Sequence, residues 1–320
     1  MATGKKKLLG LFIDPIYKLN VNKDTSCRLA AEAESRGFDV FYFNTNGLYF
    51  DNGDVRASGQ MVHFDRGDGI QNDHWFGEDK DISLKKCDAI LVRRDPPMDS
   101  SYLTATYMLD LLRDDVVMIN DPMFMRNSHS KLQALQFSQF MVPTLIASDK
   151  AAVKRFFEAH QDIILKPVHG MGGQGVVRMK DGKDPNFNSL VDTMLKAYGG
   201  HVMAQQYIQG ADQGEKRIIL FDGDVYGAII KKAATGDFRG NISAGATFEK
   251  TDLTDREKEI VAALKPYIQE RNLFFVGLDV INGHVIEINS ISPGALSWAN
   301  MVYDTPFERI FWDVFDKKYA

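Results

Sequence analysis

The stretch that decides the fold is residues 274–293, which read FFVGLDVINGHVIEINSISP. Two apolar runs flank Asn282-Gly283, a dipeptide that is typical of the tight turn between two antiparallel strands. Two carboxylates and one amide interrupt these runs, and such oxygen ligands suit a hard cation such as Mg²⁺: Asp279, Glu287 and Asn289. The stretch predicts a β-hairpin that carries a candidate metal site. A buried hairpin with one polar, solvent-facing side is the alternative.

A metal site formed by these three residues requires a particular register of the hairpin. Glu287 and Asn289 are two residues apart, so their side chains share one face of a strand. Asp279 joins that face only if it lies opposite Glu287. A regular two-residue turn would instead place Asp279 opposite Ile286 and send Glu287 to the other face. A three-ligand site therefore requires an odd-length turn or a β-bulge near residues 282–284.

Composition narrows the class of protein. The chain has 320 residues, which is enough for two or three compact domains. A net charge of −5 argues against nucleic acid as the main partner. The two cysteines, Cys27 and Cys87, lie far apart in the sequence and indicate neither a disulfide framework nor a cysteine metal site. The apolar run at residues 8–13 is too short for a signal segment, and no run is long enough to cross a membrane. We therefore expect a cytoplasmic protein without a membrane partner.

The N-terminal part predicts a parallel sheet. A buried strand at residues 8–13 is followed by a loop, by a helix capped by Ser26 and ended by Gly37, and by a strand at 40–43. Residues 46–80 are polar and rich in Gly and Asp, and we expect irregular strands and loops there. No G-x-G-x-x-G follows the first strand, so the fingerprint of a dinucleotide fold is missing.

Two arginines follow the next expected strand, at residues 89–92. Arg93 and Arg94 precede Pro96-Pro97, and a rigid loop of this kind could hold a substrate carboxylate in bidentate fashion. The alternative is a solvated strand end with Arg94 paired to Asp95. The remaining elements of the chain are expected as helices near 104–113, 128–140, 149–160, 188–198 and 254–271, and as a short strand after Pro143 and strands near 116–119, 163–166, 176–179, 202–208, 218–221 and 225–230.

A glycine-rich segment, HGMGGQGVVR at residues 169–178, lies between two of these strands. It lacks G-K-[ST] and leads into a strand, so it is neither a P-loop nor a Rossmann turn. Its free backbone N–H groups could lie against phosphate oxygens, and Lys166 just before it could neutralise them. Lys131, in the first turn of an expected helix, is unfavourable with the helix dipole unless an anion lies nearby. These features predict nucleotide binding; a flexible surface hairpin is the alternative.

Residues 231–246 are too polar and glycine-rich for a core strand, and we expect a mobile lid that carries cations. Thr254-x-x-Glu257 is a capping box that opens a helix running to about Arg271. That helix leads directly into the hairpin at 274–293.

Order and spacing of these motifs resemble the ATP-grasp superfamily, and within it the chain is similar to the bacterial glutathione synthetases. The motifs that carry the resemblance are DPI at 14–16, RDPP at 94–97, ILKP at 164–167, GMGG at 170–173, DFRGN at 237–241, VGLD at 276–279, and EIN at 287–289 followed by Ser292-Pro293. The resemblance implies an α/β fold, α+β in its C-terminal parts, with an N-terminal parallel-sheet domain before the ATP-grasp domain. It implies divisions at residues 1–122, 123–200 and 201–320, and a homo-oligomer, either a tetramer or a dimer.

The resemblance also implies a reaction. ATP would phosphorylate the cysteinyl carboxylate of γ-glutamylcysteine, and the glycine amine would then displace phosphate to give glutathione. ATP and Mg²⁺ (or Mn²⁺) would be the cofactors, because phosphoryl transfer depends on positioning and charge neutralisation. The residues implied are Asp279, Glu287 and Asn289 for the metal; Lys131, Lys166, Gly170, Gly172, Gly173, Gly175, Gln205, Gln206, Tyr207, Ile208 and Lys216 for ATP; Arg217, Lys231 and Arg239 for the chemistry; and Asp14, Arg94, Asn241, Ser292 and Pro293 for the substrates.

Several positions depart from the family pattern. Lys231 and Ala233 stand where the family has Arg and Pro, Ala246 ends the lid where the family has Gly, and Gly294 follows Ser292-Pro293 where the family continues with Thr. These positions border the substrate pocket, so two alternatives stay open. One is a related ATP-grasp ligase that joins a γ-glutamyl peptide to a different amine, and the other is an ATP-binding protein without turnover.

Overall fold

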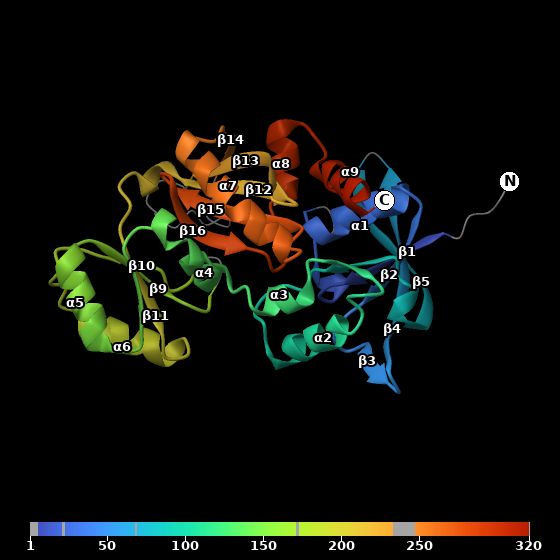
Figure 1. The fold of residues 1–320 in the computed structure, drawn as a ribbon, viewed down its shortest axis with the longest axis horizontal. Helices are drawn as coiled ribbons and strands as arrows, with labels where there is room; N and C mark the ends of the chain where they lie inside the picture. The colour runs from blue at the N-terminus through green and yellow to red at the C-terminus, as the bar shows by residue number, and fades with distance from the viewer. Residues whose placement is uncertain (1–5, 21–22, 68, 171–172, 233–246, 320) are drawn as a thin grey trace.

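The computed structural model describes residues 6–20, 23–67, 69–170, 173–232 and 247–319. In these ranges the chain forms three β-sheets that follow one another in sequence and are flanked by helices (Figure 1). The first sheet has a parallel centre, and the other two are antiparallel. The α/β fold class, with α+β character towards the C-terminus, is confirmed. None of the helices in the described ranges is long and apolar enough to span a membrane.

The first sheet has the strand order β3-β4-β2-β1-β6-β7, with β5 paired to β4. Its parallel pairs are β1 with β2, β1 with β6, and β6 with β7, so the carboxyl ends of these strands meet at one edge. The strands are β1 (Lys7–Phe12), β2 (Phe38–Phe43), β3 (Leu48–Asp51), β4 (Asp54–Gly67), β5 (Gly69–Ser83), β6 (Ala89–Val92) and β7 (Val117–Ile119). The helices of this part are α1 (Thr25–Ser35), α2 (Ser100–Asp110) and α3 (Pro122–Arg126).

Residues 46–80 are more regular than their composition predicts. They form β3 and most of a long antiparallel hairpin, β4–β5, at the outer side of the sheet. Residues 76–80 of β5 are exposed, and a strand of that kind needs few apolar side chains. The expected irregular strands are present, with register shifts at residues 60–62 and 64–66. The expected loops are strand instead, because one face of β4 is buried at Val55, Ala57 and Val62.

Helix α1 is capped by Asp24 and not by Ser26. The Asp24 carboxylate accepts a hydrogen bond from the backbone N–H of Cys27, one turn into the helix. The hydroxyl of Ser26 instead accepts a hydrogen bond from Nε of Arg93. Gly37, with a positive φ of 93°, follows the helix end as predicted.

The second sheet has the order β10-β9-β11-β8, and all of its pairs are antiparallel. Its elements are β8 (Thr144–Ala147), α5 (Lys150–His160), β9 (Ile163–Pro167), β10 (Val177–Met179), α6 (Phe187–Ala197) and β11 (Val202–Gln206). The boundary expected at residue 200 cuts β11 from the sheet to which it is hydrogen-bonded. We propose that this boundary lies within residues 207–214 instead.

The segment that leads into the second sheet is not one helix. A short helix, α4 (Ser130–Gln133), continues as a 3₁₀ helix at Ala134–Phe140. The backbone is non-helical at Phe137 (φ −118°, ψ 34°), so two short helical pieces meet there, and Ala134, Phe137 and Phe140 are the buried residues of the segment. Packing against the third sheet therefore replaces the regular helix that the sequence predicted.

The third sheet, with the order β14-β13-β12-β15-β16, is antiparallel throughout. Its elements are β12 (Glu215–Phe221), β13 (Asp224–Lys232), β14 (Thr247–Lys250), α7 (Asp255–Glu270), β15 (Phe275–Ile281), β16 (His284–Asn289), α8 (Leu296–Tyr303) and α9 (Phe307–Tyr319). The capping box of α7 is present, with Thr254 and Glu257 bonded reciprocally.

Helix α9 joins the first and third parts of the molecule. Its Phe311 and Trp312 are fully buried in one core with residues of β1, α1 and β15. The indole N–H of Trp312 donates to the backbone oxygen of Leu29 at 2.8 Å, and its ring packs on Phe38 with 5.3 Å between centroids. The aromatic side chains of this C-terminal helix are therefore part of the core.

Asn120 ties the end of β7 to the hairpin of the third sheet. Its buried side-chain amide donates to the backbone oxygens of Phe275 and Ser290, both at 2.7 Å, and accepts from the backbone N–H of Phe275 at 2.8 Å. The first sheet and the hairpin at 274–293 are thereby held in one fixed relation.

Candidate active site

The hairpin has both the predicted register and a regular turn. Asp279 lies opposite Glu287, whereas Val280 pairs with Val285. Asn282 and Gly283 have φ values of 44° and 73°, as a two-residue turn of type I′ requires. The extra residue is therefore Ile286, and the β-bulge sits next to Glu287. The register prediction is confirmed, but the distortion lies two residues beyond the turn region where it was expected.

This bulge gathers the three candidate metal ligands on one face. The amide of Asn289 donates to the Asp279 carboxylate at 2.9 Å. Arg217 on β12, the strand next to β15, contacts the same carboxylate with two nitrogens. Burial raises the pKa of Asp279 to about 6. Arg217 opposes this shift, and Glu215 adds to it. Such a carboxylate is poised to gain from a divalent cation.

The donor set fits a hard cation that keeps other ligands. In the described ranges no three His, Cys, Asp or Glu side chains gather as a metal cluster. The side-chain ligands that this hairpin supplies for a metal are therefore two carboxylates and one amide oxygen. Mg²⁺ typically takes one or two carboxylates and completes its shell with water and substrate phosphates. The residues present suit that mode of binding.

Two lysines lie beside these ligands. The Lys131 ammonium donates to the backbone oxygen of Gly170 at 2.7 Å and lies 3.3 Å from the Glu287 carboxylate. Lys166 on β9 is buried, and burial lowers its pKa. Glu287 and Asp279 oppose this shift, so both lysines lie in the field of the acidic hairpin. Two cations beside two carboxylates can bind an anion together with a divalent metal.

The glycine-rich segment forms the connection between β9 and β10, which pair antiparallel as predicted. Gly173 and Gly175 have positive φ values of 73° and 69°, which favour glycine. A Cβ on Gly175 would also lie 2.8 Å from the ring of Pro167. Gly172, Arg239 and Asn241, which the sequence predicts as site residues, lie outside the described residues.

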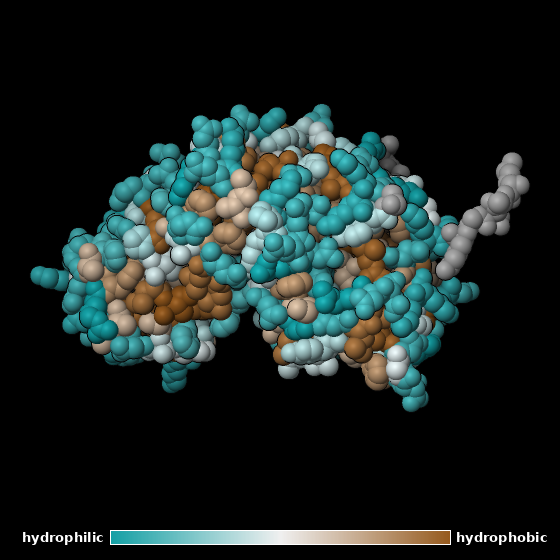
Figure 2. Space-filling model, in the orientation of Figure 1, coloured by the Kyte–Doolittle hydropathy of each residue, from teal (hydrophilic) through white to brown (hydrophobic). Residues whose placement is uncertain are grey.

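The segment expected to contact adenine, residues 205–208, is strand only as far as Gln206. The Gln205 side chain is buried and donates to the hydroxyl of Thr144 at 2.9 Å. The backbone N–H of Tyr207 donates to Asp162, and the Arg178 guanidinium stacks 3.3 Å from the centre of the Tyr207 ring. Figure 2 shows apolar side chains gathered over β9 and β11, beside a notch between this lobe and the N-terminal lobe.

Alternation along β12 separates two neighbouring cations. Arg217 faces Asp279, but Lys216 points to the opposite face and bonds Glu257 at 2.6 Å. The structure therefore does not bring Lys216 to the predicted phosphate site, and its ammonium supports the start of α7 instead. Lys231 on β13 lies 2.8 Å from the Glu215 carboxylate. Although burial opposes it, Lys231 helps to hold the pKa of Glu215 below its ordinary value.

A cavity of about 120 Å³ opens between the third sheet and α8. Its lining combines charged groups with aromatic and aliphatic ones. Its lining residues are Glu215, Arg217, Ile229, Lys231, Phe248, Asp279, Gly294, Ala295 and Trp298. Arg217 and Asp279 thus line the cavity, whereas Lys131 and Lys166 do not.

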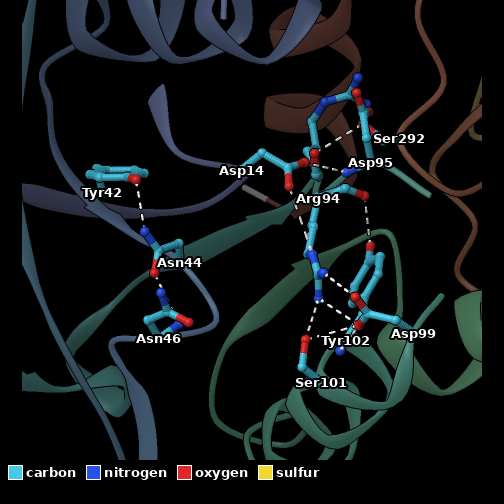
Figure 3. A network of polar contacts seen from close by, with 11 residues as sticks. Asp14, Tyr42, Asn44, Asn46, Arg94, Asp95, Asp99, Ser101, Tyr102 and Ser292 are labelled. Carbon is cyan, nitrogen blue, oxygen red and sulfur yellow. Dashed lines mark hydrogen bonds and ion pairs between the residues drawn. The ribbon is translucent and has the colours of Figure 1, made fainter. Parts of the chain in front are cut away.

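Three of the predicted substrate residues, Asp14, Arg94 and Ser292, lie close together at the carboxyl ends of β1 and β6 (Figure 3). Asp14 accepts from the backbone N–H of Asp95 at 2.7 Å. The Ser292 hydroxyl donates to the backbone oxygen of Arg93 at 3.0 Å, and the Arg93 guanidinium donates to the backbone oxygen of Pro293 at 2.7 Å. The loop after the hairpin is therefore fastened to the N-terminal sheet.

Arg94 has a partner that the sequence did not predict. Its guanidinium donates to both oxygens of Asp99, at 3.1 and 2.7 Å, and stacks 4.9 Å from the ring of Tyr102. Asp95, the expected alternative partner, points instead to Ser292. The fork of Arg94 is thus already oriented, since Asp99, the N-cap of α2, fixes it at the strand end.

Several lining residues were not among the predicted site residues: Glu215, Ile229, Phe248, Ala295 and Trp298. Glu215 could have been found from its spacing, because it lies two residues before Arg217 and shares a strand face with it. Phe248 and Trp298 carry no local signal, since their contact joins β14 to α8. From the sequence, an aromatic side chain in a strand or helix is interpreted as part of the core. Only the fold shows that it borders a cavity.

Comparison with known proteins agrees with this architecture. Residues 8–126 match the model for the prokaryotic glutathione synthetase N-terminal domain, and residues 130–303 match the model for the prokaryotic glutathione synthetase ATP-grasp domain. A curated glutathione synthetase from Rhodopseudomonas palustris is 35% identical over 96% of this chain and 97% of its own length. One from Escherichia coli O6:H1 is 36% identical over 89% of this chain and 90% of its own length.

Solved structures show the same fold at low sequence identity. A D-cycloserine synthetase superposes with a TM-score of 0.66 and 16% identity, covering 98% of this chain and 100% of its own. The D-alanyl-alanine synthetase A of Vibrio cholerae superposes with a TM-score of 0.57 and 13% identity, covering 97% of both chains. Matches over both domain models and nearly the whole length of the curated relatives show that the chain belongs to the prokaryotic glutathione synthetase family.

Proposed function

We propose that this chain joins γ-glutamylcysteine to glycine at the expense of ATP, giving glutathione, ADP and phosphate. The chain is an ATP-dependent ligase of the ATP-grasp fold, in a family that uses ATP and a divalent metal. The observation that carries the proposal is the convergence of Lys131, Lys166 and Arg217 on the acidic hairpin. Cations and oxygen ligands at one point serve phosphoryl transfer, and a nucleophilic side chain is not needed there.

The nucleotide side of the site lies between the second and third sheets. Lys131 and Lys166 would hold the ATP phosphates beneath the Gly170–Gly175 connection. The backbone of residues 205–208 would contact adenine, supported by the apolar surface over β9 and β11. Asp279, Glu287 and Asn289 would hold the divalent metal, which we propose is Mg²⁺, with Mn²⁺ as a substitute. When bound, the metal supplies charge neutralisation at the transferring phosphate.

The substrate side lies at the edge of the N-terminal sheet. Arg94 and the Asp14 loop would contact the dipeptide, and Ser292 and Pro293 would fix the wall between the dipeptide and the phosphate. Arg217 would stabilise charge on the transferring phosphate, and Lys231 would assist it. Arg239 would hold a substrate carboxylate, and Asn241 would contact the substrates. Exclusion of water matters here because an acylphosphate exposed to water hydrolyses.

A second candidate substrate follows from the departures at Lys231, Ala246 and Gly294. Lys231 and Gly294 line the cavity beside Asp279. A changed wall at that place favours a related ligase that uses a different amine with the same γ-glutamyl peptide. The acylphosphate chemistry would be unchanged.

The assembly is proposed to be a homo-oligomer, either a tetramer or a dimer. An apolar stripe on α2 and its end supports this: Leu103, Tyr107 and Leu111, four residues apart, are 38%, 58% and 58% exposed. Light scattering coupled to size exclusion tests the proposal. A monomer at micromolar concentration would overturn it.

The proposed reaction is tested by phosphate release from ATP with γ-glutamylcysteine and a panel of amines, in the presence of Mg²⁺ or Mn²⁺. We expect release to require the dipeptide, the metal and glycine, and the product to have the mass of glutathione. Release with another amine but not with glycine would support the second candidate. No amine-dependent release with any of them would overturn both.

A further inference from the structure

Two aromatic rings form a wall of the cavity between the third sheet and α8. Phe248 and Trp298 lie 4.9 Å apart between ring centroids with only 16° between their planes. Ile229, which is fully buried, also lines the cavity. Lys231 lies next to Phe248 in the β13–β14 ladder, and Arg217 lies next to Ile229 in the β12–β13 ladder. The lining thus places apolar side chains directly beside the charged groups that the proposed phosphoryl transfer needs.

The ring pair is built by elements far apart in the sequence. Phe248 lies on β14, opposite Lys231 in the ladder with β13. Trp298 lies in the first turn of α8, just after Ala295, whose positive φ of 90° turns the chain into the helix. Both rings are partly exposed, so they do not belong to the core clusters of the described chain. Their contact closes one end of the cavity.

The position of the cavity fits the second substrate of the ligase. Lys131 and Lys166, on the nucleotide side, do not line it, whereas Arg217 and Asp279 do. Gly294 and Ala295 line it as well, and they continue the segment that Arg93 fastens to the dipeptide side. An amine placed here would lie next to the reacting carboxyl group and away from the adenine.

The size of the cavity limits what it can hold. Its volume of about 120 Å³ is smaller than the ~150 Å³ of an apolar protein cavity that holds benzene. The ratio leaves room for about five non-hydrogen atoms, which is the size of glycine. A side chain on the α-carbon of the acceptor would have to occupy the space that the two rings fill.

We propose that the Phe248–Trp298 ring pair determines the acceptor specificity of this ligase, by closing the pocket against any amino acid with a side chain. This inference rests on the proposed function, because it assigns the cavity to the acceptor amine. The rings do not touch the reacting atoms. They exclude acceptor amino acids that carry a side chain. Removing either ring opens the cavity and admits L-alanine or L-serine in place of glycine.

The test compares Trp298→Ala and Phe248→Ala with the native protein. Phosphate release is measured with γ-glutamylcysteine and, in turn, glycine, L-alanine, L-serine and L-2-aminobutyrate. One methyl or methylene group discriminated by a pocket is worth about 10–200-fold in kcat/KM. We expect the ratio of kcat/KM for glycine to that for L-alanine to fall by about that factor in each variant. KM for ATP and for γ-glutamylcysteine should remain unchanged.

Controls separate specificity from stability. Met301→Ala alters the same helix, but its side chain is 69% exposed and does not line the cavity. This variant should keep the native ratio, and Trp298→Phe should restore most of it. Thermal unfolding of each variant identifies one that fails to fold, in which case Trp298→Leu, which shortens the wall but keeps apolar packing, decides the matter.

The possible results of these assays test the ring-pair proposal and the proposed function separately. Glycine-dependent release in the native protein with an unchanged acceptor ratio in both ring variants would overturn the ring-pair proposal alone. Native preference for L-2-aminobutyrate over glycine would overturn it too, because the rings would then bind a side chain instead of excluding one. Absence of amine-dependent release in the native protein would overturn the proposed function, and the acceptor assignment with it.

Discussion

Replacement of Asp279 by asparagine should make the ligand-free protein more stable and the enzyme almost inactive. A raised pKa measures how strongly the folded environment disfavours the charged carboxylate, at about 1.4 kcal/mol for each tenfold change in proton affinity. The pKa of Asp279 is about 6, against an ordinary 3.8, which corresponds to about 3 kcal/mol at neutral pH. An asparagine side chain would keep the shape without the charge, and Arg217 would still face Glu215 and Glu287.

The pH dependence follows from the sign of this shift. The folded-state pKa is raised, so between about pH 4 and pH 6 the native state binds more protons at Asp279 than the unfolded state does. This carboxylate therefore costs stability above pH 6, and the cost disappears as the pH falls towards 4. The variant should be about 1–3 kcal/mol more stable than the native protein at pH 7.5. The two should converge near pH 4.

Urea and thermal unfolding in EDTA measure the stability difference. A gain of 1 kcal/mol raises the melting temperature of a chain of this size by about 1–2 °C. Asp114→Asn, an exposed site between α2 and β7, is the matched control and should change nothing. In the presence of Mg²⁺ and ADP the native protein should gain more stability than the variant, because the metal compensates the charge of Asp279.

Phosphate release by the same variant should fall by at least about 100-fold, since loss of a ligand to the metal removes about 3 kcal/mol of charge stabilisation. Unchanged release would show that Asp279 does not serve the reaction and would overturn its assignment as a metal ligand. A variant less stable than the native protein at pH 7.5 would refute the electrostatic reasoning, because the ion pair with Arg217 would then outweigh the cost of burial.

Three further predictions concern neighbouring features. ATP affinity should weaken as the pH rises past the lowered pKa of Lys166, because the neutral amine no longer attracts phosphate; titrations of Lys166→Arg should show a flatter profile. Gly277→Ala would place a Cβ 3.1 Å from the Arg217 side chain. The resulting shift of Arg217 should lower kcat by about tenfold with little change in melting temperature. An unchanged kcat would show that Arg217 needs no fixed position. Asn120→Ala removes three buried hydrogen bonds between the first sheet and the hairpin and should lower the unfolding free energy by about 3 kcal/mol in urea titrations.

The sequence alone determined the local elements and most of the acidic hairpin. Strands such as Ala89–Val92 and the capping box of α7 appeared as expected, since apolar runs and capping residues act over a few neighbours. The register of Asp279 against Glu287 could also be predicted, because a shared ligand face permits one alignment. The bulge at Ile286 could not, since a regular Asn-Gly turn and a bulge further along the strand satisfy the same demand.

Tertiary structure alone decided which charged groups meet. Lys216 and Arg217 are adjacent in sequence and identical in charge, yet the pleat of β12 sends one to α7 and the other to Asp279. Arg94 pairs with Asp99 and not with Asp95, because the start of α2 folds back onto the strand end.

The cavity wall depended on the fold in the same way. Phe248 and Trp298 are far apart in the sequence, and no periodic pattern records a contact between a strand and a helix at such a separation. Local sequence encodes which face of an element is buried, whereas the identity of the partner depends on how the elements pack.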